Sequence, residues 1–145
     1  MTATDKGNYI QNEEMVRVLR AAVAEARKDV RRFDMDFWIR RAGYGFGLDR
    51  TEAFIKYHSE CGTTLCLASL ILTVAPPEYF TDNPPARILT AAKQIAGLSH
   101  DQAHRLFVLL NWPAAYQALY SRAKSPGQLV DALEERVEHF IRTGE

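Results

Sequence analysis

The chain has 145 residues, of which 47% are hydrophobic and 25% charged, and its 18 basic and 18 acidic side chains cancel. This length suits one domain, which buries roughly 70% of the surface that its unfolded chain exposes. The balanced charge excludes a global electrostatic attraction to nucleic acid or to an anionic membrane. Two cysteines are too few for the disulfide framework of a small secreted domain.

The ends and the apolar runs of the chain predict a cytoplasmic protein without membrane association. Residues 1–6 lack the basic and apolar order of a secretory signal. The longest apolar run, residues 65–75, is interrupted by Ser69 and Thr73 and is shorter than the ~20 residues that span a bilayer. We therefore expect both cysteines to remain thiols in a reducing compartment.

Residues 1–11 are polar and predict a flexible N-terminal segment before one helical domain over residues 12–145. Asn12 is a typical N-cap, and Glu13 and Glu14 follow it at the positive end of a helix. Apolar residues then recur at spacings of three and four, which predicts a buried helix face. This face consists of Met15, Val18, Leu19, Ala22, Val23 and Ala26.

The next stretch lacks a clear period. Residues 33–39 alternate large apolar with acidic side chains, which favours a short turn or an extended piece anchored on the core. Within residues 40–60, three glycines and two aromatic residues interleave over 43–47, so we expect a loop. Asp49 is the predicted cap of a short helix that runs to about Tyr57.

Residues 61–77 contain no charged side chain and predict the buried centre of the fold. Their length favours a central helix over about residues 62–75, ended by Pro76 and Pro77. A strand is the competing interpretation because several residues of the run are β-branched. These are Thr63, Thr64, Ile71, Thr73 and Val74.

The second half carries start and stop signals for four more helices. Asn83 before Pro84 predicts the first start and Gly97 its end, and Ser99 opens the second helix through a capping box with Gln102. Pro113 opens the third, after a predicted packing anchor at Trp112, and Ser125 with Gln128 opens the fourth, which Gly144 ends. The expected inner faces are Ile88, Leu89, Ala92 and Ile95; Ala103, Leu106, Phe107 and Leu110; Tyr116, Leu119 and Tyr120; and Leu129, Val130, Leu133, Val137, Phe140 and Ile141.

Together these elements predict an all-α fold, a compact bundle-like domain of about six helices around the buried central helix. The acidic outer residues of the last helix, Asp131, Glu134, Glu135 and Glu138, indicate a solvated face.

Four motifs in fixed order resemble a family of small uncharacterised bacterial and bacteriophage proteins. They are Phe33-Asp34-Met35-x-x-Trp38, Cys61-Gly62-Thr63-x-x-Cys66-x-Ala68, Ala96-Gly97-Leu98-Ser99-x-x-Gln102-Ala103-x-x-Leu106-Phe107, and Trp112-Pro113. The resemblance covers most of the chain and implies a fold and a bacterial or phage setting, without an assigned activity. Ser69 stands where the family has glycine, and the glycine–aromatic stretch before Cys61 resembles an insertion.

The predicted binding residues are Arg40, Arg41, Tyr44 and Phe46, in the loop that resembles an insertion. Arginine and tyrosine are favoured at the centres of protein interfaces, so this loop predicts a contact with a partner protein. The alternative is that the two rings fold back and cover the core.

The two cysteines suggest two further kinds of chemistry. At the predicted start of the central helix, Cys61 has a position that lowers a thiol pKa, and His58 or His100 would be its base in a cysteine-dependent hydrolase or transferase. Cys61 and Cys66 also form one half of a zinc-binding pattern, and His100 and His104 form the other half. The alternatives are a small core residue at Cys66 and solvent-facing histidines.

No convincing set of nucleophile, base and orienting group emerges from these residues. The sequence therefore favours a non-enzymatic interaction or regulatory accessory protein, of phage or mobile-element type, that binds a host or competing macromolecule. We expect no cofactor and no metal, and a protein rather than a nucleic acid as the partner. The cysteine-dependent enzyme remains the alternative.

Overall fold

The computed structural model describes residues 12–43 and 47–145, so the predicted flexible segment 1–11 and the loop residues 44–46 lie outside the described residues. In this part of the chain seven α-helices and a two-stranded sheet form an all-α fold, which confirms the predicted class. The α-helices are α1 (Glu13–Lys28), α2 (Thr51–Tyr57), α3 (Leu67–Thr73), α4 (Ile88–Ala96), α5 (His100–Phe107), α6 (Ala114–Arg122) and α7 (Pro126–Thr143). Short 3-10 turns occur at η2 (Val30–Arg32), η3 (Pro77–Thr81) and η4 (Leu109–Asn111).

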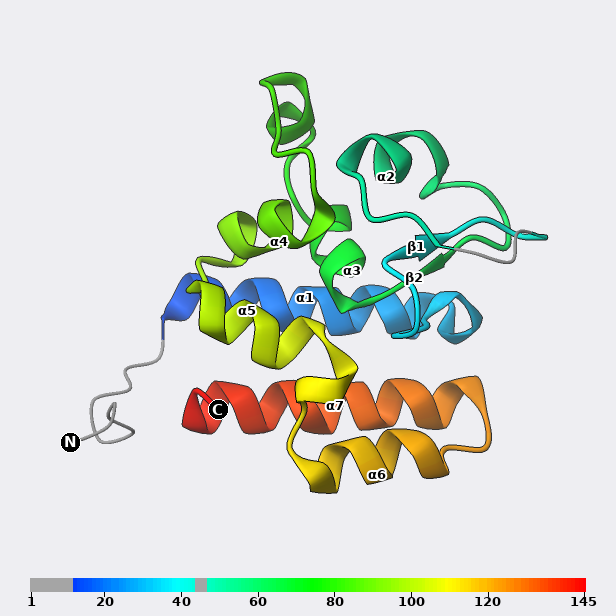
Figure 1. Cartoon of the computed structure of the whole chain (residues 1–145), viewed down its shortest axis with the longest axis vertical. Helices are drawn as coiled ribbons and strands as arrows, with labels where there is room; N and C mark the ends of the chain where they lie inside the picture. Colours follow the sequence, from blue (N-terminus) through cyan, green and yellow to red (C-terminus); the bar gives the residue numbers. More distant parts are fainter. Residues whose placement is uncertain (1–11, 44–46) are drawn as a thin grey trace.

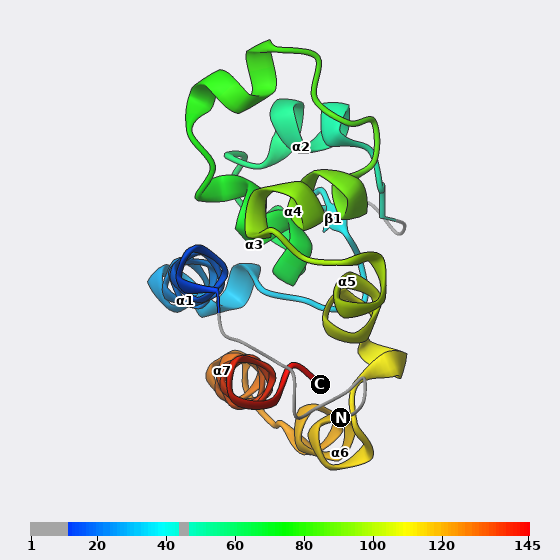
Figure 2. The ribbon, with the colours of Figure 1, turned by 90° about the vertical axis from the view of Figure 1, so that its left-hand side faces the viewer.

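The helices stack in successive layers (Figures 1 and 2). The long helices α1 and α7 run side by side, α6 covers α7, and α3 and α4 lie on the other side of α1. The helix α2 lies furthest from α7, above the small sheet. Because α3 contacts both α1 and α4, it lies at the centre of the core.

Helix α1 forms as predicted. The Asn12 side chain accepts a hydrogen bond from the Met15 amide at 3.1 Å, and the acidic first turn and basic last turn both match the helix dipole. All six predicted inner residues are buried. The helix ends at Lys28 because Asp29 is extended and caps the following turn η2.

The central buried helix is confirmed, but its predicted start at residue 62 is wrong. Gly62 has a φ of +84°, and the strand β2 (Thr64–Leu65) pairs antiparallel with β1 (Ile39–Arg40) before α3 begins at Leu67. Six of the seven residues of α3 are buried. The β-branched residues before the helix therefore form an extended piece, as the competing interpretation held for this short part of the run.

Two other predicted helix starts are wrong for a related reason. Arg50, not Asp49, is the N-cap of α2, and α4 begins at Ile88 rather than after Asn83. The Thr51 amide donates to the Ala86 carbonyl at 2.8 Å, and the Ile88 amide donates to the Asp49 carbonyl at 2.9 Å. This long-range backbone pairing holds the residues before both helices in extended conformation.

Of the two predicted capping boxes, Ser99 and Gln102 form the first completely. The second is only half formed, because Ser125 accepts from the Gln128 amide at 3.2 Å, whereas the Gln128 side chain accepts from the Lys124 amide at 2.6 Å. Gly97 and Gly144 end their helices with φ of +69° and +74°, which glycine adopts without steric cost.

Trp112 is the predicted anchor, 2% exposed and donating from Nε1 to the Leu106 carbonyl at 2.8 Å. The expected inner positions Leu110 and Leu119 are wrong, because these side chains are 80% and 40% exposed. Helix α5 ends at Phe107, so Leu110 lies on the turn η4 and no longer follows the helical period.

Candidate functional site

The predicted binding residue Arg41 lies against an aromatic ring near the end of the small sheet. Its guanidinium carbon is 4.0 Å from the centre of the Tyr57 ring, at the end of α2. The same group contacts the Glu60 carboxylate through Nε at 3.1 Å and through Nη2 at 3.4 Å. The arginine is therefore held in one orientation while 29% of its side chain remains exposed.

Arg40 repeats this arrangement on the neighbouring position. Its guanidinium carbon lies 4.5 Å from the centre of the Phe37 ring, and Nη2 is 4.0 Å from the Asp34 carboxylate. Its side chain is 34% exposed. We call the surface formed by these two stacked pairs the arginine edge, which consists of Asp34, Phe37, Arg40, Arg41, Tyr57 and Glu60.

The other two predicted binding residues, Tyr44 and Phe46, lie outside the described residues. Of the four predicted positions the structure thus places two, and it brings them together with two rings, Phe37 and Tyr57, that the sequence did not assign to the site. The sequence offered a signal only for Tyr57, at the predicted end of a short helix.

The cysteine prediction depended on a helix start that the structure places elsewhere. Cys61 is an exposed thiol in the turn before β2, and the dipole of α3 begins six residues later, at Leu67. In the described part of the chain no hydrogen bond joins Cys61 to an imidazole; the Nδ1 atom of His58 instead faces the Phe54 carbonyl at 2.8 Å. His100 lies on α5. Cysteine chemistry therefore stays a prediction without geometric support.

The predicted zinc pattern does not come together either. Cys66 is buried at the N-cap of α3, where burial raises the pKa of its thiol to about 11. The rings of His100 and His104 lie close, with centroids 4.3 Å apart on α5. Within residues 12–43 and 47–145, no group of three or more potential ligands gathers where it could hold a metal ion.

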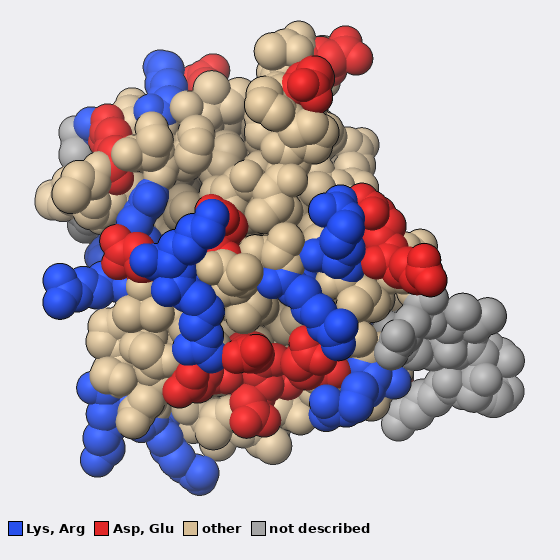
Figure 3. All heavy atoms as spheres, turned by 180° about the vertical axis from the view of Figure 1, so that it is seen from behind, with Lys and Arg blue, Asp and Glu red and all other residues tan. Residues whose placement is uncertain are grey.

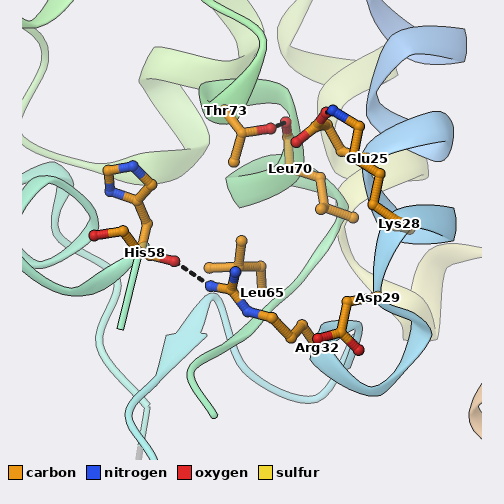
Figure 4. A pocket seen from close by; sticks show the side chains of 10 residues that line it. Glu25, Lys28, Asp29, Arg32, His58, Leu65, Leu70 and Thr73 are labelled. Atoms are coloured by element: carbon orange, nitrogen blue, oxygen red, sulfur yellow. Dashed lines mark hydrogen bonds and ion pairs between the residues drawn. The ribbon is translucent and has the colours of Figure 1, made fainter. Parts of the chain in front are cut away.

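A polar hollow of about 370 Å³ lies between α1, α3 and the turn after α2. Figure 4 shows Arg32 reaching across it to the main-chain oxygen of His58, with Glu25 and Thr73 on the far side. Arg32 also donates from Nε to the Thr63 carbonyl at 2.9 Å. Because this guanidinium holds two carbonyls of the turn, its first role is to fix the turn that carries Cys61.

A second hollow, also of about 370 Å³, is mainly apolar and was missed by the sequence reasoning. Figure 1 shows the segment before β1 passing beside the end of α5, and the hollow lies between them. We call it the apolar hollow, which is lined by Met35, Asp36, Trp38, Cys66, Phe107, Val108, Leu109 and Leu110. Three separate segments form it, residues 35–38, Cys66 and residues 107–110, so no single stretch of the sequence predicts it.

The face of the molecule opposite to the one seen in Figure 1 carries paired charges (Figure 3). An acidic row on α7 is flanked by basic side chains, and Arg27 of α1 contacts Asp131 at 2.8 Å and Glu134 at 2.6 Å. Arg20 contacts Glu138 at 2.9 Å. The predicted solvated face is thus largely occupied by ion pairs between the two long helices.

Arg136 is a fully buried cation on α7. Its guanidinium contacts Nδ1 of His139 at 3.1 Å and donates to the main-chain oxygens of Arg105 and Glu145. Burial lowers the pKa of Arg136 to about 10. Burial also lowers the pKa of His139, and the charges of Arg136 and Arg142 lower it further.

Across residues 12–43 and 47–145, no helix combines the length and the apolar character that a membrane span requires. No family model, curated protein or solved structure matches the chain. The resemblance described above therefore remains a prediction, and the arguments for function come from the geometry of these surfaces.

Proposed function

We propose that the chain is a non-enzymatic interaction protein that binds a protein partner through the arginine edge. One observation carries the proposal: Arg40 and Arg41 both lie stacked on aromatic rings and remain about one-third exposed. Arginine and the aromatic residues are enriched at the energetically dominant positions of protein interfaces. The accessory role in a phage or mobile element belongs to the proposal and depends on the resemblance alone.

Pre-organisation makes this surface suitable for binding. A flexible arginine side chain loses rotamer freedom on association, at about 0.5–1.5 kcal/mol for each side chain that becomes fixed. Here the Tyr57 ring and the Glu60 carboxylate already hold Arg41, and the Phe37 ring supports Arg40. The two guanidinium groups are therefore already oriented as planar hydrogen-bond donors in the free chain, so binding a partner costs less side-chain entropy.

The test compares three tagged chains as baits in a lysate of the organism that encodes the protein. They are the wild type, the double variant Arg40→Ala with Arg41→Ala, and a control with Arg87→Ala and Arg122→Ala, two exposed arginines outside the edge. Each protein captured by the wild type is quantified, purified and titrated by calorimetry against all three chains. We expect one partner whose affinity falls at least about tenfold for the edge variant and stays unchanged for the control.

The readout separates folding from binding. Circular dichroism and the unfolding midpoint of each variant establish that the helices remain intact. If every purified partner binds the folded edge variant and the wild type equally, the arginine edge is not the docking surface and the proposal is wrong.

A further inference from the structure

We propose that the apolar hollow binds a small organic cation, a primary amine carried on a compact aromatic body. The hollow adjoins the arginine edge through the segment with Met35, Asp36 and Trp38, but this inference does not depend on the proposed protein partner. Seven of the eight lining residues are apolar or aromatic or carry a neutral thiol, and Asp36 alone is charged. Pockets for small molecules have this character, with mainly apolar walls and a few placed polar groups.

The volume suits a ligand larger than a single benzene ring. The hollow measures about 370 Å³, within the ~300–1,000 Å³ of typical ligand pockets and above the ~150 Å³ of a cavity that accepts benzene. A bicyclic ring with a short side chain therefore fits the space. The half-buried Trp38 supplies an aromatic wall against which such a ring stacks.

The lip of the hollow exposes apolar surface that a ligand would cover. Leu110 is 80% exposed, more than any other large hydrophobic residue in the described part of the chain. The turn η4 presents it rigidly, since the Asn111 amide donates to the Val108 carbonyl at 2.9 Å and the Trp112 amide to the Leu109 carbonyl at 3.0 Å. Covering Leu110 removes apolar area from water without ordering a mobile loop.

The carboxylate of Asp36 at the opening of the hollow favours a positively charged ligand. Asp36 has no ion-pair partner among the described residues, and its amide donates to the Asp34 carboxylate at 2.8 Å, so two carboxylates lie close together. Burial and the Asp34 charge raise the pKa of Asp36, against the opposing effect of Arg40, whose guanidinium is stacked on Phe37 and contacts Asp34. An ammonium beside Asp36 relieves this repulsion, whereas a carboxylate on the same ring adds to it.

The buried thiol of Cys66 adds no second charge to the lining of the hollow. The Cys66 thiol is buried, and burial raises its pKa to about 11, so the sulfur is neutral at physiological pH. The sulfur donates to the Ser69 hydroxyl at 4.0 Å, and Ser69 in turn donates to the Trp38 carbonyl. The aromatic body of the ligand therefore contacts neutral side chains, and its ammonium group contacts Asp36, the one charged residue of the lining.

The experiment uses three probes with one ring system: tryptamine, the neutral tryptophol and the anionic indole-3-propionate. The chain contains two tryptophans, so a nitrogen-15 proton correlation spectrum of the labelled protein shows two indole peaks. Trp38 lines the hollow, whereas Trp112 is buried with its Nε1 bonded to the Leu106 carbonyl. We expect tryptamine to shift the Trp38 peak saturably, with a Kd of order 1 mM, and to leave the Trp112 peak in place.

Variants assign the interaction. Asp36→Asn should weaken tryptamine at least about fivefold, to the level of tryptophol, and Leu110→Ser should weaken both probes. Glu52→Gln, an exposed carboxylate on α2, is the matched control and should change nothing. The unshifted Trp112 peak in each free variant establishes folding.

Two results would overturn the proposal. No saturable shift of the Trp38 peak with tryptamine excludes the site. Equal affinities for the amine, the alcohol and the carboxylate, or an Asp36→Asn variant that binds tryptamine as tightly as the wild type, exclude a cation-selective hollow.

Discussion

The two sides of the molecule are held together by different means. On one side, the long helices α1 and α7 have side-chain caps, buried apolar faces and exposed ion pairs between them. On the other side, residues 29–66 contain only short elements, joined by a two-residue strand pair and by side chains that bond to main-chain carbonyls. The first side depends on area buried, the second on a few specific hydrogen bonds.

The proposed binding surfaces and the regular packing lie on different sides of the molecule. The regular side offers ion-paired, solvated surface, whereas the irregular side carries the arginine edge, the polar hollow and one wall of the apolar hollow. Loops placed by a rigid scaffold commonly supply binding surfaces. Four measurements test whether the two sides are held together in these different ways.

The largest effect should come from the core of the regular side. Leu133 on α7 is fully buried, so Leu133→Ala leaves a cavity and should lower the free energy of unfolding by about 3 kcal/mol. Urea unfolding followed by circular dichroism measures it. Leu110→Ala, at an exposed leucine, is the matched control, and its free energy of unfolding should stay within about 0.5 kcal/mol of the wild-type value. Equal losses for the two variants would mean that the burial assigned to α7 is wrong.

The second-largest effect should come from Arg32, which anchors the turn on the irregular side. Arg32→Met keeps the aliphatic stem and removes the donors to the His58 and Thr63 carbonyls, which should cost about 2 kcal/mol. Hydrogen exchange should accelerate at the amides of Glu60 and Thr63, which bond within this turn, and much less in α7. Arg31→Met, at an exposed neighbour, is the control. If both variants exchange alike, Arg32 does not fix the turn.

A smaller effect should follow pH. The pKa of His139 is lowered from 6.5, chiefly by burial, so the folded chain binds a proton less readily than the unfolded chain. Stability is therefore fully present above pH 6.5 and is lost as the pH falls through the folded pKa. Unfolding midpoints between about pH 8 and about pH 5 measure the loss, which His139→Gln should reduce. A wild type that becomes more stable on acidification in this window would contradict the assignment.

The smallest effect should come from the ion pairs between α1 and α7. Arg27 is bonded to two carboxylates, but it and its partners are more than one-third exposed, so Arg27→Met should cost less than about 1 kcal/mol. The loss should shrink further in high salt. A loss as large as that for Leu133→Ala would show that charge, rather than burial, joins the two helices.

Many helix boundaries outside residues 29–66 could be predicted because their signals are local. The caps at Asn12, Ser99 and Ser125 act on amides three residues away, and the stops at Gly97 and Gly144 require only a positive φ. Such features are complete within one helical turn, so the sequence displays them directly.

The irregular side could be predicted only in part because its bonds join distant segments. The pairing of β1 with β2 fixes where α3 begins, and the β-branched residues Thr63 and Thr64 favoured a strand without indicating its partner or its end. Outside this side, the position of Leu110 continued the helical period of Leu106, and only the end of α5 at Phe107 turns it outward. The arginines of the edge were named from the sequence, but the rings beneath them become neighbours only in the fold.

The central claim is that residues 34–41 and 57–60 form the docking surface on a helical scaffold that takes no part in binding. Hydrogen exchange of the free chain and of its complex with the captured partner tests this most directly, because each amide reports its own protection. The account predicts slower exchange on complex formation in those two segments and unchanged exchange along the outer face of α7. Protection confined to α6 and α7, with unchanged exchange at residues 34–41 and 57–60, would contradict it.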